Sequence, residues 1–188
     1  MNVVGIAGSP RRLGNSEKLL DRVLEGAVLS GARVEKIVIN ELTFKPCQEC
    51  GGCKATGVCV IRDGMDGIYK LLREADAVVL ATPIFFASVS AQTKMMIDRF
   101  QCAWEAKYNL RKAGQTKKRT GVLIGVAASC RKDFFDNARL VTKAFFATLD
   151  IEYSHELFCG RLEKGEDVDK NKELLDKAFM IGKDMVAK

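Results

Sequence analysis

The sequence lacks the features that would place a chain in a membrane or mark it for export. No apolar run approaches the roughly 20 residues that a membrane-spanning helix needs. The first residues, Met1–Gly5, carry neither the charged region nor the cleavage site of a secretory signal peptide. Seven cysteines, an odd number, are then more typical of a reducing compartment. We therefore expect a cytoplasmic protein without a membrane partner.

Histidine is almost absent, and so are the familiar nucleotide-binding motifs. His155 is the only histidine, and it lies on a segment that we expect to be an edge strand, where a structural role is more typical than a catalytic one. No triad-like set of residues accompanies it. The G-x-G-x-x-G fingerprint is missing, which disfavours a dinucleotide fold, and the missing G-K-[ST] excludes a Walker loop.

Positive charge is abundant, and much of it lies in one stretch of the chain. The 188-residue chain has a formal net charge of +6. Six cations fall within thirteen residues: Lys107, Arg111, Lys112, Lys117, Lys118 and Arg119. We interpret the stretch as a solvated connection, with a docking face for an acidic redox partner as the second interpretation. No nucleic-acid partner is expected, because there is neither a binding motif nor interleaved aromatic residues.

Five short apolar segments alternate with helical patterns along the chain. The expected strands are residues 3–7, 34–39, 77–81, 121–127 and the more polar 151–158. The expected helices begin near Asn15 or Ser16 and end at Gly31, then cover 63–75, 90–104, a segment including 140–149, and 168–186. Continuous apolar runs are typical of strands buried on both faces. The pattern predicts one doubly wound α/β domain over residues 1–188, with a five-stranded parallel sheet in the order 2-1-3-4-5.

The loop that follows the first strand is rich in groups that bind phosphate. Residues 8–16 offer the hydroxyls of Ser9 and Ser16, the amide of Asn15 and a guanidinium from Arg11 or Arg12. Backbone N–H groups at the start of a helix add to the attraction for an anion. A plain capped turn needs one hydroxyl and no arginine, so the loop predicts a phosphate site.

The loop after the third strand supplies a different kind of surface. Phe85 and Phe86 offer flat apolar area, although one of them is expected to be ordinary core, and residues 84–89 and 127–130 offer backbone donors and acceptors. A phosphate site beside a flat, polar-edged pocket predicts flavin mononucleotide, FMN. The candidate FMN contacts are Ser9, Arg11, Asn15, Ser16, Pro83, Ile84, Phe85, Phe86, Ser88, Val89, Ala128 and Ser129.

Four cysteines form the densest motif of the chain. Cys47, Cys50, Cys53 and Cys59 have the spacing C-x2-C-x2-C-x5-C in a loop at residues 46–62. Thiolates are soft ligands, and one loop can present all four to a single centre. Structural zinc usually pairs two distant C-x2-C knuckles, and a disulfide does not suit a reducing compartment, so an iron–sulfur cluster is favoured over both. The fourth spacing differs from that of ferredoxins.

Several motifs together resemble one family. They are Gly8-Ser9-Pro10-Arg11 with Gly14-Asn15-Ser16, the cysteine loop, Asp63-Gly64-Met65, Ala75-Asp76-Ala77, Thr82-Pro83-Ile84-Phe85-Phe86, and Ser88–Gln92 with Lys94 and Ile97-Asp98-Arg99. They resemble the iron–sulfur flavoprotein branch of the NADPH-dependent FMN reductase superfamily of flavodoxin-like proteins. The resemblance implies FMN on the first loop and a four-iron four-sulfur cluster on the four cysteines. It also implies reduced ferredoxin as electron donor, and a homodimer or homotetramer in which flavin and cluster of neighbouring subunits face each other.

These observations lead to three hypotheses about function. The first is a redox flavoprotein that passes electrons through the cluster to FMN and on to oxygen, peroxide or a quinone. The second is a cluster-free NAD(P)H-dependent FMN or quinone reductase, whose cysteines are spare thiols or bind zinc. The third is a non-catalytic metal-binding or redox-sensing module whose cysteine loop is read by a protein partner.

Overall fold

The computed structural model describes residues 1–162, 164 and 167–187. Its strands are β1 (Asn2–Ala7), β2 (Arg33–Val38), β3 (Ala77–Phe85), β4 (Ser88–Val89), β5 (Thr120–Val126) and β6 (Glu152–Cys159). Its α-helices are α1 (Asn15–Leu29), α2 (Met65–Glu74), α3 (Ala91–Arg99), α4 (Gln101–Trp104), α5 (Asp133–Thr148) and α6 (Lys172–Val186). Short helical turns cover η1 (Ile39–Glu41), η2 (Glu105–Asn109) and η3 (Asp167–Lys170).

The five long strands form one parallel sheet in the order β2-β1-β3-β5-β6, which confirms the predicted order. The strand order reverses between β1 and β3, so the crevice beyond their carboxyl ends is the expected place for a ligand. The more polar β6 is an edge strand, as its sequence predicted. Burial on both faces explains the unbroken apolar sequences of β1, β3 and β5.

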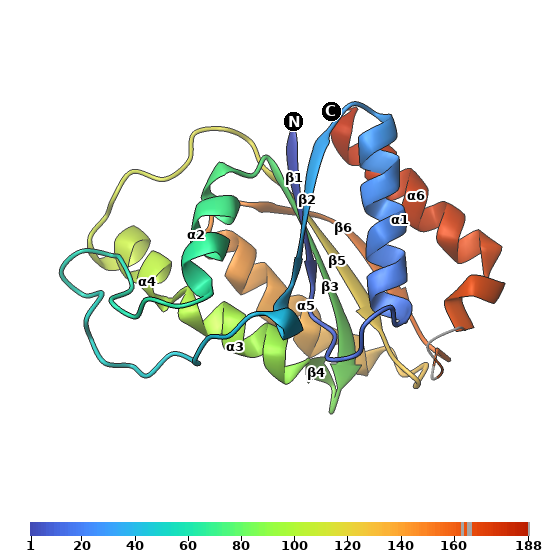
Figure 1. Ribbon diagram of the computed structural model, residues 1–188, viewed down its shortest axis with the longest axis horizontal. Coiled ribbons are helices and arrows are strands. Elements are labelled where there is room, and N and C mark those ends of the chain that lie inside the picture. The colour runs from blue at the N-terminus through green and yellow to red at the C-terminus, as the bar shows by residue number, and fades with distance from the viewer. Residues whose placement is uncertain (163, 165–166, 188) are drawn as a thin grey trace.

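Helices cover both faces of the sheet, as Figure 1 shows. On one face, α1 and α6 cross so closely that backbone meets backbone. A Cβ at Gly182 would lie 1.9 Å from the carbonyl oxygen of Val23, and one at Gly26 would lie 2.1 Å from that of Phe179. Helices α2, α3 and α5 pack on the other face around a core that includes Met96. No helix among the described residues is both long and apolar enough to span a membrane.

Several boundaries differ from those predicted. Helix α1 has Gly14 as its N-cap without a side-chain bond, so neither Asn15 nor Ser16 caps it. The third strand continues to Phe85 and turns back as the antiparallel β4, where a loop was expected. The last helix begins only at Lys172, because Asn171 accepts a bond from the Leu174 N–H and caps it there.

The basic stretch is less solvated than predicted. Arg119 is only 3% exposed and donates to the carbonyl oxygens of Ala75 and Leu149, at 2.8 and 2.7 Å, and to that of Leu72. Lys107 forms an ion pair with Asp150. These contacts join the ends of α2 and α5, so part of this stretch stabilises the fold instead of facing water.

Candidate functional site

A cavity of about 410 Å³ opens at the carboxyl ends of the central strands. Its walls come from the loop after β1, the end of β3, the end of β5 and Leu162. Eight of the predicted FMN contacts line it: Ser9, Arg11, Asn15, Ser16, Pro83, Ile84, Phe85 and Ala128. The structure therefore brings together the predicted phosphate loop and the predicted ring surface.

The phosphate loop starts at Gly8, whose carbonyl oxygen accepts hydrogen bonds from buried hydroxyls. The hydroxyl of Ser90 donates to the Gly8 carbonyl, and that of Thr93 lies 3.4 Å from the same oxygen. A Cβ at position 8 would come within 2.0 Å of the Thr93 hydroxyl oxygen, so only glycine fits. Next along the loop, the Arg11 N–H donates to the Ser9 hydroxyl at 3.0 Å. The turn thus sets Ser9 beside the backbone of Arg11 in the cavity wall.

Glu17 braces the same loop from inside helix α1. Its side chain is 1% exposed and accepts the Leu13 N–H at 2.7 Å and the ammonium of Lys36 at 3.0 Å. Arg12 pairs with it at 3.2 Å and also with Glu41. Burial raises the pKa of Glu17, but the bonds from Arg12, Leu13 and Lys36 outweigh burial and lower it. Glu17 therefore stays charged and holds Leu13 at its positive φ of 55°.

Asn15 lies in the cavity wall, but its amide is already engaged. Its Nδ2 donates to the Lys164 carbonyl at 2.6 Å, and its Oδ1 accepts the Val168 N–H at 3.1 Å. These two bonds join the phosphate loop to the segment before α6. Ser9, Ser16 and Arg11 also line the cavity, so their side chains and the backbone N–H groups of the loop are the candidate phosphate donors.

Of the FMN contacts predicted on the β3–β4 hairpin, some line the cavity and others do not. Phe85 is 50% exposed at the cavity, while Phe86 is fully exposed and does not line it, so neither is the core residue that we expected. Phe86 and Ala87 both have positive φ, at 49° and 58°. Val89 packs in a small core cluster, and neither Ser88 nor Ser129 lines the cavity.

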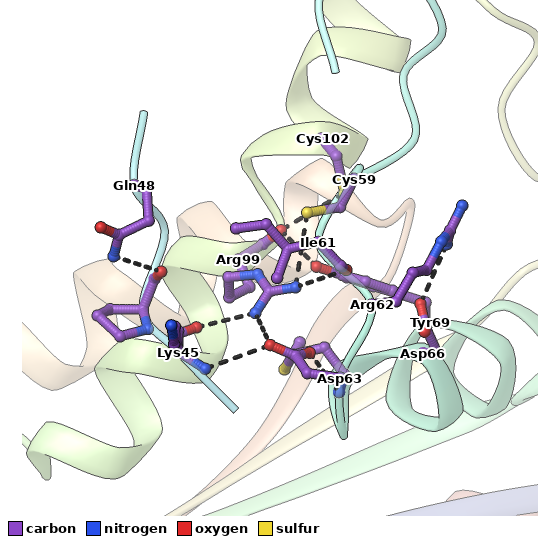
Figure 2. A network of polar contacts seen from close by, with 12 residues as sticks. Lys45, Gln48, Cys59, Ile61, Arg62, Asp63, Asp66, Tyr69, Arg99 and Cys102 are labelled. Carbon is purple, nitrogen blue, oxygen red and sulfur yellow. Dashed lines mark hydrogen bonds and ion pairs between the residues drawn. The ribbon is translucent and has the colours of Figure 1, made fainter. Parts of the chain in front are cut away.

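The cysteine loop begins and ends at two chain segments that lie close together, Lys45 on the entry side and Ile61–Asp63 on the exit side. We call these two segments the neck of the loop. In Figure 2, the guanidinium of Arg99 lies between the two sides of that neck. Its Nη1 donates to the Lys45 carbonyl at 2.8 Å on the entry side and to Asp63 at 2.6 Å on the exit side. Its Nη2 lies 3.5 Å from the Cys59 sulfur and 3.3 Å from the Ile61 carbonyl oxygen.

Asp63 completes the neck from the exit side. It accepts the Lys45 N–H at 3.2 Å and, at 3.0 Å, the N–H of Met65, the first residue of helix α2. Burial raises the pKa of Asp63, but the bonds from Arg99 and the two backbone N–H groups lower it overall. The carboxylate is therefore held as the charged partner of Arg99.

All seven cysteines are free thiols. Within the motif, Cys53 lies near Cys47 and Cys59. Burial raises the pKa of Cys53, and the nearby Glu105, Cys59 and Cys47 raise it further. Among the described residues, however, no three histidine, cysteine or acidic side chains are gathered tightly enough to hold a metal ion. Four free thiols with a buried guanidinium at one sulfur suit an iron–sulfur cluster in their chemistry.

Cys102, which looked isolated in the sequence, lies beside Cys59 (Figure 2). It is buried, and its thiol donates to the Arg99 carbonyl at 3.4 Å. Both thiols open onto a second cavity of about 720 Å³, which extends to Arg119 and Asp150. The other two lone cysteines are separate: Cys159 is in the core, and Cys130 is exposed beside Arg161.

Sequence reasoning missed the residues that support the two sites. Arg99 and Asp63 were noted only within motifs, and Glu17 was not singled out, because charged side chains at helical spacing are usually solvated. The available signal was an arginine at the end of the helix face that also carries Thr93 and Met96. Burial of such a charge is rare unless it is paired.

The sheet order and the ligand-sized cavity at its switch point are those of a flavodoxin-like fold. The solved NAD(P)H:quinone oxidoreductase from Methanothermobacter marburgensis shares this fold, with a TM-score of 0.76 over 98% of this chain and 96% of the other, at 18% identity. Residues 1–147 match the model of the NADPH-dependent FMN reductase family. The chain belongs to that family.

The curated proteins that the chain resembles include several iron–sulfur flavoproteins. An iron–sulfur flavoprotein of Archaeoglobus fulgidus is 48% identical over 99 residues, which cover 53% of this chain and 45% of that protein. One from Methanocaldococcus jannaschii is 37% identical over 129 residues, which cover 69% of this chain and 63% of that protein. The chain thus spans between about half and just under two thirds of the length of these relatives.

Proposed function

We propose that the protein is an FMN- and iron–sulfur-containing redox flavoprotein. It takes electrons from reduced ferredoxin or a similar carrier through a four-iron four-sulfur cluster to FMN, and passes them to a small acceptor such as oxygen, peroxide or a quinone. The observation that supports it most is the pairing of a phosphate-and-ring cavity at the sheet's switch point with a four-thiol loop on the same chain.

Different residues of the first site bind the phosphate and the ring of FMN. Ser9, Ser16 and the N–H groups at the start of α1 hold the phosphate, and Arg11 adds a positive charge in the cavity wall. Pro83, Ile84, Phe85 and Ala128 supply apolar surface for the ring.

The residues of the second site hold the cluster. Cys47, Cys50, Cys53 and Cys59 are the four thiolate ligands, and the Arg99–Asp63 pair fixes the neck of their loop. When both groups are bound, FMN exchanges one or two electrons and the cluster exchanges one, so together they link one-electron and two-electron chemistry.

Two further parts of the proposal concern assembly. In Figure 1 the cysteine loop extends away from the sheet, beyond α2 and α3. A homodimer or homotetramer in which this loop faces the FMN cavity of a neighbouring subunit would bring the two centres together. Light scattering on the native protein tests this, and a monomeric mass under all conditions would rule the arrangement out.

One observation favours a second candidate function. The thiols of the motif are not gathered into a metal site among the described residues, which suits a cluster-free NAD(P)H-dependent FMN or quinone reductase. The fold shared with a quinone oxidoreductase is compatible with that activity.

The absorption spectrum of protein produced without oxygen separates these functions. Flavin bands with a broad additional shoulder, together with about four iron atoms and four sulfides per chain, are the expected result. Flavin bands without iron would favour the reductase. If neither a flavin nor a cluster is detected, the redox-sensing module is the remaining hypothesis. Zinc in place of iron, in protein expressed with iron supplied, would contradict the cluster.

A further inference from the structure

We propose that Arg99 is a positioning residue for the iron–sulfur site, and that it both closes the cysteine loop and tunes the cluster through the Cys59 sulfur. The inference rests on the proposed function, because it needs a cluster on this loop. None of the described hydrogen-bond partners of Arg99 is a candidate FMN contact, so we expect its replacement to leave FMN binding unchanged.

The burial of Arg99 is the first observation that carries the inference. Its side chain is 1% exposed, which makes it the largest fully buried side chain of the described residues. A buried guanidinium is costly unless its charge is balanced and its N–H groups are bonded. Asp63 supplies the balancing charge, and Nη1 and Nη2 also bond to the neck of the loop, so that among the guanidinium nitrogens only Nε has no hydrogen-bond partner in the described part of the chain.

The second observation is that one planar group bonds to both sides of the neck. Lys45 lies two residues before the first cysteine of the motif, and Ile61 lies two residues after the last. A guanidinium holds its donors in a rigid plane, so the two chain segments are fixed relative to each other (Figure 2). Closing a long loop at its neck reduces the conformational freedom that four ligands must lose when they bind one centre.

The third observation is the contact between the guanidinium and a candidate ligand sulfur. Nη2 of Arg99 lies 3.5 Å from Sγ of Cys59, within the range of an N–H···S bond. Hydrogen bonds and positive charge at a ligand sulfur withdraw electron density and raise the reduction potential of an iron–sulfur cluster. Removing this donor should therefore lower the potential.

The carbonyl of Arg99 is fixed as well, which sets the direction of its side chain. It accepts the Tyr69 hydroxyl at 2.9 Å and the Cys102 thiol at 3.4 Å, at the point where α3 ends and α4 begins. Arg99 is thus anchored at its backbone by α2 and α4, while its side chain reaches the loop.

The chain offers a matched control in Arg119. It is also buried, at 3% exposure, and it also donates to three backbone carbonyls, but none of its partners lies in the cysteine loop. Arg119→Lys and Arg99→Lys both keep the positive charge and lose the planar fork. A purely structural role would give the two variants the same effects.

The experiment compares wild type, Arg99→Lys and Arg119→Lys, all produced and purified without oxygen. FMN content and thermal unfolding report on the fold. Iron and sulfide content, the rate of iron release to an anaerobic chelator, and the midpoint potential of the cluster report on the site. The double variant Asp63→Asn/Arg99→Gln replaces the buried ion pair by a neutral pair and serves if the single variant does not fold.

For Arg99→Lys we expect normal FMN content, iron release about tenfold faster or more, and a lower cluster potential. The double variant, which loses the charge as well, should show a larger fall in potential. Arg119→Lys should unfold at a lower temperature without a change in iron release or potential.

Two results would overturn the inference, and they are distinguishable. Wild-type protein with FMN but no iron would end the proposed function, and this inference with it. A cluster in wild type, with the same release rate and potential in both lysine variants, would refute the role of Arg99 alone. If only the double variant folds, an unchanged potential and release rate there would refute it equally.

Discussion

At the scale of single residues, the candidate FMN site depends on a few polar groups at one turn. Ser9 and Arg11 are two of the polar residues that line the cavity. A charge-assisted hydrogen bond contributes about 1.5–3 kcal/mol, which is roughly tenfold or more in affinity.

Ser9→Ala and Arg11→Ala are each expected to weaken FMN binding by about tenfold or more, because each removes a donor to a charged phosphate. Titration of apoprotein with FMN, followed by flavin fluorescence, measures the affinity. Ser88→Ala is the matched control, since Ser88 does not line the cavity. Unchanged affinity in both variants would contradict the phosphate assignment.

Glu17 gives the site a dependence on pH. Its pKa is lowered in the folded protein, so its contribution is fully present above the ordinary glutamate pKa of about 4.3 and is lost as pH falls through the lowered folded value. Glu17→Gln should therefore cost about 1–3 kcal/mol of unfolding free energy at pH 7, and the difference from wild type should shrink toward zero in acid.

Urea unfolding at several pH values between 3 and 7 checks this expectation. A difference between wild type and Glu17→Gln that stays constant down to the lowest pH would show that Glu17 is not charged in the folded protein. Such a result would also remove the brace that we assign to the phosphate loop.

At the scale of elements, α1 carries the phosphate loop and is fixed by its close crossing with α6. Gly182→Ala is expected to cost about 2–3 kcal/mol, because the new Cβ would meet the Val23 carbonyl oxygen at 1.9 Å and the helices must separate. FMN affinity should fall with stability, since α1 moves.

Gly67→Ala provides the control for Gly182→Ala. Gly67 lies in α2 with nothing within 4 Å of an added Cβ. Thermal and denaturant unfolding should show it stabilised by roughly 0.5–1 kcal/mol, the usual gain of alanine over glycine in a helix. An unchanged unfolding free energy in Gly182→Ala would show that α1 and α6 can move apart without cost.

The cysteine loop is the element whose chemistry can be tested most simply. Cys59→Ala is expected to strip or destabilise the cluster while FMN remains, because the phosphate loop and the cysteine loop leave different strands. Iron and flavin analyses on the same preparation measure both. Cys130→Ala, which changes an exposed thiol outside the motif, should keep its iron. Full iron in Cys59→Ala would mean that the fourth ligand is misassigned.

How far the sequence predicted the molecule depends on the kind of interaction. Buried strands and their order followed from apolar runs, because burial on both faces leaves a local pattern. The β3–β4 hairpin did not, since Phe86 and Ala87 adopt positive φ without glycine. Arg99 could not be assigned either, because its partners lie 36 to 54 positions away and only the fold brings them together.

At the scale of the whole molecule, the account joins two sites in one electron path. The flavin cavity lies at the switch point of the sheet, and the cysteine loop lies beyond α2 and α3 (Figure 1). The basic residues left in water on the stretch after α4, such as Lys118 with a side chain 83% exposed, could steer an acidic electron carrier.

The most direct test is stopped-flow reduction of the bound flavin. We expect reduced ferredoxin to bleach the flavin of wild-type protein faster than NADPH does, with a rate that falls as salt rises. In Cys59→Ala the ferredoxin-driven rate should collapse, although the flavin is still bound. Fast reduction by NADPH, no response to ferredoxin and no effect of Cys59→Ala would contradict the account and would identify a cluster-independent reductase.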